Sequence, residues 1–188
     1  LEAWAAIGKA TLTRGDDSAL LEFDGRGNAE RVQLETLRAT MPTGTLDAAG
    51  TVGWTPALDW DVTATLAGFD PGYFAAGWAG NVSGSLASKG RRREDGLFQG
   101  TLDVPTLSGR LRDRSLDARG TFALDGNNGE GDLALSLGGS RVTAKGKVGD
   151  TLTVDAAFRP LNLADLLPDA SGTLSGTVNL TGARTAPT

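Results

Sequence analysis

The chain has 188 residues, a net charge of −5, 27 glycines, and neither cysteine nor histidine. The missing residue types exclude disulfides and thiolate metal sites and remove the commonest metal ligand and general base. Acidic and basic residues are interspersed, which excludes the basic surface that binds nucleic acid. No apolar run approaches the roughly 20 residues of a membrane helix.

Hydrophobic residues make up 39% of the chain, below the usual globular fraction, and glycine is about twice as frequent as average. These values predict a thin core. The alternating pattern described next is already under way at both ends, so we interpret the chain as a piece of a longer protein.

Apolar and polar residues alternate in chain order over 59–66, 116–124, 133–137, 142–148 and 152–158. In the first run, Trp60, Val62 and Leu66 share one parity while aspartates and threonines take the other. Such alternation is typical of a strand with one apolar face and one face in water. The sequence therefore predicts about a dozen strands and an all-β fold.

Short turn-forming segments separate these runs and favour antiparallel hairpins between successive strands. The predicted turns are Asp16-Asp17, Asp24-Gly25, Asp113-Arg114, the glycine- and asparagine-rich stretch 125–129, Gly138-Gly139 and Gly149-Asp150.

Two segments, 69–74 and 161–166, break the alternation in the same way. In the first, Asp70 is placed to cap a helical turn with Pro71 at its first position, and in the second Asn162 is the cap. The pairs Phe69/Phe74 and Leu161/Leu166 have the spacing of hydrophobic staples. Both segments are therefore predicted to be short helical turns.

The two helical turns lie 92 positions apart, and this offset continues through the following residues. Gly80, Ser83, Gly84 and Gly90 recur as Gly172, Ser175, Gly176 and Gly182. Recurrence at a fixed offset indicates a fold that grows by adding units. We expect one elongated β-repeat segment over 1–188, with copies over approximately 44–90 and 142–182.

The apolar face of the predicted strands must be shielded from water, yet the sequence predicts no long amphipathic helix that could lie over it. Burial of one Leu or Phe side chain is worth about 1.5–3 kcal/mol, so the sheet must curl or an apolar ligand must cover it. Many glycines share the apolar parity, namely Gly50, Gly84, Gly100, Gly109, Gly120, Gly146 and Gly176. They either mark kinks and bulges of a narrow sandwich or leave room inside a U-shaped trough suited to acyl chains.

We predict an apolar wall along this trough, hydrated on its opposite face. The residues assigned to the wall are Trp60, Val62, Leu66, Phe98, Leu102, Leu111, Leu116, Phe122, Leu124, Leu133, Leu135, Leu137, Val154 and Phe158. No catalytic or metal-ligating residue is assigned, because the acidic residues lie mainly on turns or on the outward parity. The run Arg91-Arg92-Arg93, followed by Glu94 and Asp95, is interpreted either as a solvated hairpin tip or as a contact for lipid headgroups or an acidic partner.

Two other architectures compete with the trough. A membrane barrel needs aromatic girdles, and aromatic residues make up only 6% of the chain. A β-helix would also stack repeats but forms parallel coils, against the antiparallel hairpins that the short turns favour.

Several stretches resemble the TamB family of AsmA-like bacterial envelope proteins. They are Gly50-Thr51-Val52-Gly53-Trp54, Leu58-Asp59-Trp60-Asp61-Val62, Phe69-Asp70-Pro71, and Gly80-x-Val82-Ser83-Gly84-x-Leu86. The resemblance implies a curved, taco-like antiparallel sheet with an apolar interior, grouped with bridge-like lipid transfer proteins. This chain would be an interior, periplasmic part of an inner-membrane-anchored protein of a Gram-negative bacterium.

The implied role is phospholipid transport between the inner and outer membranes and the biogenesis of outer-membrane proteins and autotransporters, without enzymatic activity. The expected partners are phospholipid and, through parts outside this chain, the outer-membrane barrel TamA. A second copy could also pair at an edge strand. No cofactor is expected beyond a bound phospholipid or detergent acyl chain. The alternatives are a structural β-helix or β-sandwich scaffold, or a chaperone surface for strands of outer-membrane proteins.

Overall fold

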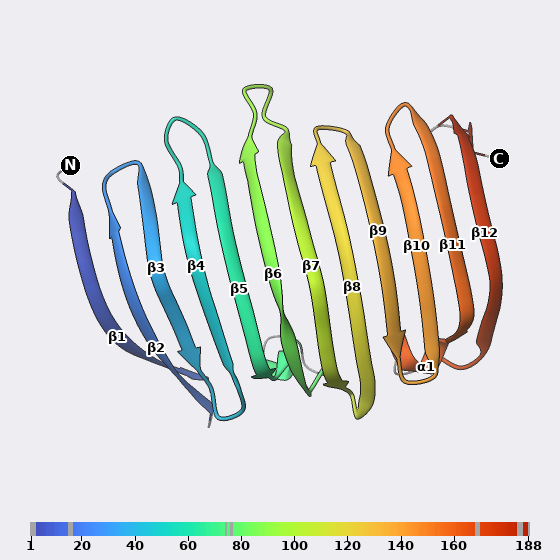
Figure 1. Ribbon diagram of the computed structural model, residues 1–188, viewed down its shortest axis with the longest axis horizontal. Helices are drawn as coiled ribbons and strands as arrows, with labels where there is room; N and C mark the ends of the chain where they lie inside the picture. Colours follow the sequence, from blue (N-terminus) through green and yellow to red (C-terminus); the bar gives the residue numbers. More distant parts are fainter. Residues whose placement is uncertain are drawn as a thin grey trace.

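The computed structural model describes residues 3–14, 17–73, 75, 77–167, 170–183 and 186–187. Its strands form one sheet in the order β1 to β13, each antiparallel to the next (Figure 1). The elements are β1 (Trp4–Arg14), β2 (Asp17–Gly27), β3 (Arg31–Thr40), β4 (Thr45–Gly53), β5 (Asp59–Phe69), η1 (Pro71–Tyr73), β6 (Gly80–Arg92), β7 (Phe98–Leu111), β8 (Arg114–Asp125), β9 (Asn128–Leu137), β10 (Ser140–Val148), β11 (Thr151–Asn162), α1 (Leu163–Leu166), β12 (Thr173–Ala183) and β13 (Ala186–Pro187).

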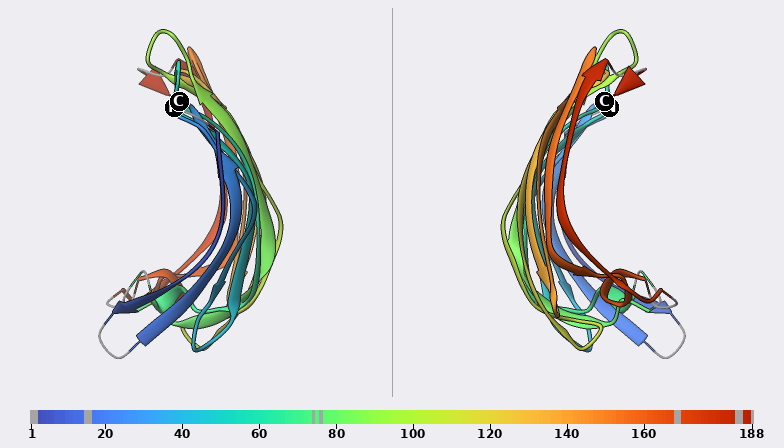
Figure 2. Two further views of the ribbon diagram at one scale, coloured as in Figure 1. Left: turned by 90° about the vertical axis from the view of Figure 1, so that its left-hand side faces the viewer. Right: turned by 90° about the vertical axis from the view of Figure 1, so that its right-hand side faces the viewer.

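The sheet bends along its strands into a C-shaped cross-section, with η1 and α1 on the concave side near the lower ends of the strands (Figure 2). The prediction of an all-β, curved, taco-like antiparallel sheet interrupted by two short helical turns is confirmed. The antiparallel order excludes the parallel coils of a β-helix, and the described residues form one layer instead of a sandwich.

The turns follow the sequence prediction with one exception. Gly138-Gly139 joins β9 to β10, and Gly126 begins the turn between β8 and β9. Asp24-Gly25, by contrast, lies inside β2, where the pairing with β3 shifts register, so the turn predicted there is wrong. Asp16 lies outside the described residues.

Strand register places the apolar parity on a single face across the whole sheet. One row of directly paired residues shows this from β4 to β11: Leu46, Leu66, Gly84, Leu107, Ala118, Leu135, Val142 and Phe158. Because successive side chains of a strand point to opposite faces, one such row fixes the orientation of every neighbouring residue.

Bulges recur in β3, β5, β7 and β11. Register shifts occur after Leu34 in β3, after Leu66 in β5, after Val104 in β7 and after Phe158 in β11. A bulge bends its strand and increases the local twist. The residues paired to these four positions are Gly50, Gly84, Gly120 and Gly176. Gly50 has φ of 146°, a conformation that side-chain-bearing residues rarely adopt. These glycines therefore mark bulges, but in an open single-layer sheet.

The offset of 92 residues also relates secondary-structure elements to one another. β5 begins at Asp59 and β11 at Thr151, and both strands carry a bulge and lead into a helical turn. The predicted caps are confirmed: Asp70 Oδ1 accepts from the Gly72 amide at 2.8 Å, and Asn162 Oδ1 accepts from the Ala164 amide at 3.3 Å. This correspondence supports the tandem organisation, which stays a prediction. Phe74 of the first staple lies outside the described residues.

The buried core is small and sits at the lower end of the concave face. Val82, Leu116 and Leu137 form its centre, with Leu137 and Val82 each 2% exposed, and Leu166 packs against them. Leu166 belongs to α1, which lies on the concave side (Figure 2). The apolar face of the sheet is therefore its concave face.

Candidate functional site: the concave groove

A groove of about 580 Å³ runs along the concave face over β5 to β11, within the roughly 300–1,000 Å³ typical of small-molecule sites. Seven of the predicted wall residues line it: Trp60, Phe98, Leu102, Phe122, Leu124, Leu133 and Val154. Its larger side chains remain accessible, since Phe122 is 41% exposed and Leu124 47% exposed. The structure thus gathers these residues into one open apolar surface.

The other seven predicted wall residues share the concave face but lie outside this groove. Leu111, Leu116, Leu135 and Leu137 belong to the buried cluster at the lower end or pack against it. Val62, Leu66 and Phe158 pair with concave-face residues of neighbouring strands. Sequence alternation therefore groups all fourteen by face, while the curvature divides them between a packed end and an accessible middle.

Small residues form the floor of the groove, and the wall prediction omitted them. Ser88, Gly100, Gly131, Ala144 and Gly146 line it together with the larger side chains. Their shared parity with the wall residues was the available signal.

Aromatic rings cover Gly90 and Gly131, two concave-face glycines outside the seven that the trough prediction named. A side chain on Gly90 would collide with the Trp60 ring, and one on Gly131 with the Phe122 ring. The Trp60 indole N–H donates to Ser88 Oγ at 2.9 Å, and the Trp60 and Phe98 ring centroids are 6.3 Å apart. A ring lying over a glycine recovers contacts that the glycine itself cannot make. The open space of the groove thus lies above and between the rings.

The convex face is polar and carries cross-strand ion pairs. Side-chain pairs join Arg38 to Asp47 at 2.6 Å, Lys89 to Asp61 at 2.8 Å and Lys147 to Glu130 at 2.9 Å, and Lys9 also pairs with Glu22. All of these side chains are solvent-exposed, where such pairs contribute little stability. Their effect is to keep this face hydrated while the concave face is apolar.

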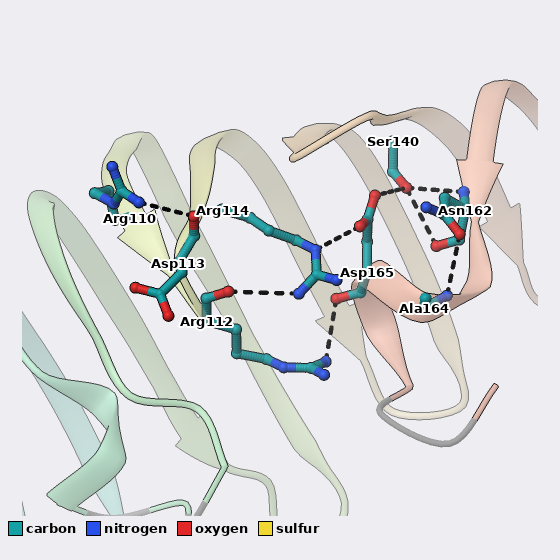
Figure 3. A network of polar contacts seen from close by, with 8 residues as sticks. All are labelled: Arg110, Arg112, Asp113, Arg114, Ser140, Asn162, Ala164 and Asp165. Atoms are coloured by element: carbon teal, nitrogen blue, oxygen red, sulfur yellow. Dashed lines mark hydrogen bonds and ion pairs between the residues drawn. The ribbon is translucent and has the colours of Figure 1, made fainter. Parts of the chain in front are cut away.

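A polar network at the lower rim holds α1 against the sheet (Figure 3). Asp165 is 3% exposed, accepts from Arg114 Nε at 2.6 Å and accepts from Ser140 Oγ at 2.7 Å. Ser140 Oγ in turn accepts from the Asn162 amide at 2.9 Å, and an Arg112 Nη donates to the Asp165 carbonyl at 3.2 Å. Asn162 was predicted as a cap and Arg114 as part of a turn, but no motif links them to Asp165, Ser140 and Arg112, so the network itself was not predicted.

The Asp165 carboxyl titrates below its ordinary range. The hydrogen bond from Ser140 lowers the pKa of Asp165 most, burial opposes this by raising it, and the Arg114 guanidinium lowers it further. The group is therefore held as a carboxylate. Its hydrogen bonds from Arg114 of β8 and Ser140 of β10 attach α1 to the sheet.

Among the described residues, three or more acidic side chains nowhere gather closely enough to hold a metal ion. No helix in the described part of the chain is both long and apolar enough to span a membrane.

The protein-family model described as the N-terminal domain of TamB matches residues 12–188 of the chain. The chain belongs to the TamB family. Over 169 residues, or 89% of the chain, it is 25% identical to the translocation and assembly module subunit TamB of Haemophilus influenzae. It covers 13% of the length of that TamB protein. No solved structure matches the chain. The family resemblance predicted from the sequence is confirmed.

Proposed function

We propose that this chain forms a segment of a hydrophobic groove that carries phospholipid between the inner and outer membranes, without catalysing a reaction. The observation that carries the proposal is the accessible apolar surface of the concave face, with Phe98, Phe122 and Leu124 each more than 40% exposed. Exposed apolar surfaces of this kind on soluble domains mark binding sites.

Acyl chains fit the chemistry of this surface better than a polar ligand does. Each CH₂ group removed from water contributes about 0.8 kcal/mol, so binding strengthens with chain length without needing a directional contact. The middle of the groove offers Ser88 as a polar side chain, and its hydroxyl already hydrogen-bonds to the Thr101 carbonyl. Such a surface would hold a chain without fixing its position, as transport requires.

The relative's name, translocation and assembly module subunit, guides the wider proposal. We place this segment in the periplasmic part of an inner-membrane-anchored protein. Other parts of that protein would contact the outer-membrane barrel TamA. In this setting, lipid delivery would contribute to the biogenesis of outer-membrane proteins and autotransporters.

Site-specific photo-crosslinking in the full-length protein in cells tests the proposal. Crosslinkers at Phe122 and Leu124, which line the groove, should capture phospholipid, whereas those at Arg119 and Asp132, on the convex face, should not. Equal capture at both pairs of positions, or capture at neither, would count against the groove. Crosslinks from Phe122 to outer-membrane protein chains instead of lipid would favour the alternative of a chaperone surface.

A further inference from the structure

The hairpin between β6 and β7 extends beyond its neighbours at the upper rim of the sheet (Figure 1). It carries Arg91, Arg92 and Arg93 in succession, and an open hollow of about 800 Å³ lies between these arginines, Gln99 and Asp125. Gln99 also contributes to the lining of the apolar groove, but Arg91, Gln99 and Asp125 pair with one another on the convex-face parity, so the hollow reaches the upper end of the groove from the convex side.

The three arginines have different partners. Arg93 donates to Asp125 Oδ1 at 2.6 Å and pairs with Asp95 Oδ2 at 3.1 Å. Arg91 donates from Nε and an Nη to Gln99 Oε1 at 3.2 and 3.1 Å. Arg92 donates from Nε to the Gly96 carbonyl at 3.3 Å and forms no ion pair with a carboxylate of the described residues. Arg91 and Arg92 are thus the two arginines of this hairpin that no carboxylate of the described residues neutralises, and their positions relative to the groove distinguish them.

Register places the side chain of Arg92 at the mouth of the groove. Arg92 pairs with Phe98, which lines the groove and is 42% exposed, while Arg91 pairs with Gln99 on the opposite parity. Arg92 also shares its parity with Gly90, which lies beneath the Trp60 ring. The Arg92 side chain therefore leaves the sheet beside Phe98, and its guanidinium lies by Gly96 at the hairpin tip, a juxtaposition that matches a molecule with an anionic head and apolar chains.

We infer that Arg92 binds the phosphate of a glycerophospholipid whose acyl chains lie against Trp60 and Phe98. A guanidinium presents two Nη groups in a planar fork that fits two phosphate oxygens. The charges around the hollow balance, with three arginines against Glu94, Asp95 and Asp125. Selectivity therefore comes from the position of Arg92, not from net charge. This inference rests on the proposed function, because it needs acyl chains in the groove.

The test uses the full-length protein with a photo-crosslinker at Leu124, which lines the groove. The purified protein is mixed with vesicles containing tail-labelled phosphatidylglycerol or tail-labelled diacylglycerol with identical acyl chains. Capture of phosphatidylglycerol should exceed that of diacylglycerol by about threefold to fivefold, the range that an exposed charge pair supports. Arg92→Gln should reduce phosphatidylglycerol capture to the diacylglycerol level, while the matched variant Arg91→Gln leaves it unchanged.

The outcomes separate the headgroup site from the groove. If both lipids are captured equally, or if Arg91→Gln and Arg92→Gln reduce capture alike, the assignment to Arg92 is wrong while the groove stands. If neither lipid is captured, the groove and the headgroup site both fail. Higher salt should reduce the preference for phosphatidylglycerol but leave diacylglycerol capture in place, since only the first depends on charge.

Discussion

Arg114 and Asp165 stand 51 residues apart in the chain, yet they form a 2.6 Å ion pair at the lower rim of the sheet. The pair joins β8 to α1, and Ser140 of β10 donates to the second carboxylate oxygen. A helix of four residues has no independent stability, because so short a helix cannot offset the cost of nucleation. The position of α1 therefore depends on this network and on the packing of Leu166.

Replacement of Asp165 by asparagine should release α1. The change removes the negative charge beside Arg114 and replaces one acceptor with a donor that faces Ser140, a loss of about 1–3 kcal/mol for buried hydrogen-bonding groups. The amide of Leu167, which donates to the Leu163 carbonyl at 2.8 Å, reports on the helix. Its hydrogen exchange should accelerate about tenfold or more in Asp165→Asn. Asp132→Asn, which alters an exposed 3.6 Å ion pair with Lys145, is the control and should leave that amide unchanged.

The attachment of α1 should also depend on pH, in a direction set by the lowered pKa of Asp165. Hydrogen bonding from Ser140 is the main cause of that lowering, with Arg114 adding to it. A carboxyl with a lowered folded-state pKa stabilises fully above its unfolded value of about 3.9, and this contribution disappears as pH falls through the folded value. Protection of the Leu167 amide, corrected for intrinsic exchange, should therefore be constant near neutral pH and decrease in acid. A decrease of equal size in Asp165→Asn would assign the effect to another group.

Alternation alone was sufficient to predict which side chains share a face. Trp60, Phe122 and Val154 come from different strands, yet all line the groove because each hairpin keeps its strands adjacent and in register. The caps of the helical turns were equally predictable, since Asp70 and Asn162 act on amides two residues away. Local geometry determines both features, so the sequence carries them directly.

Features that depend on distant parts of the chain were not predictable. The contact between Ser140 and Asp165 spans 25 residues, and neither side chain belongs to a motif. Asp24-Gly25 has the composition of a turn but lies within β2, because pairing with β3 continues across it through a shift in register. Similarly, nothing local to Gly131 indicates that the Phe122 ring from the adjacent strand covers it.

Two glycines of β9 allow the ring-over-glycine contact to be measured. Both Gly129 and Gly131 lie on the concave face, but an added Cβ on Gly131 would be 2.9 Å from the Phe122 ring, whereas on Gly129 its nearest contact is a carbonyl oxygen at 3.7 Å. Gly129→Ala should stabilise the sheet by about 0.4–1 kcal/mol through the loss of backbone freedom in the unfolded chain. Gly131→Ala should lose that gain because the ring must move. In a Phe122→Ala background the two substitutions should become equivalent in denaturant unfolding. A difference that persists there would place its cause in the backbone.

A charge within the groove should block transport without unfolding the sheet. Leu102 lines the groove and is 37% exposed, so Leu102→Glu leaves a carboxylate in contact with water in the empty protein. An acyl chain passing this position would have to dehydrate the carboxylate, at a cost that exceeds the gain from several CH₂ groups.

The matched control is Thr101→Glu, one residue away on the convex face, where the new carboxylate would face Lys89. Pulse-labelled phospholipid should reach the outer membrane about tenfold more slowly with Leu102→Glu and at the normal rate with Thr101→Glu, since each lost 1.4 kcal/mol costs a factor of ten. Normal transport by a folded Leu102→Glu protein would show that lipid does not travel along this wall.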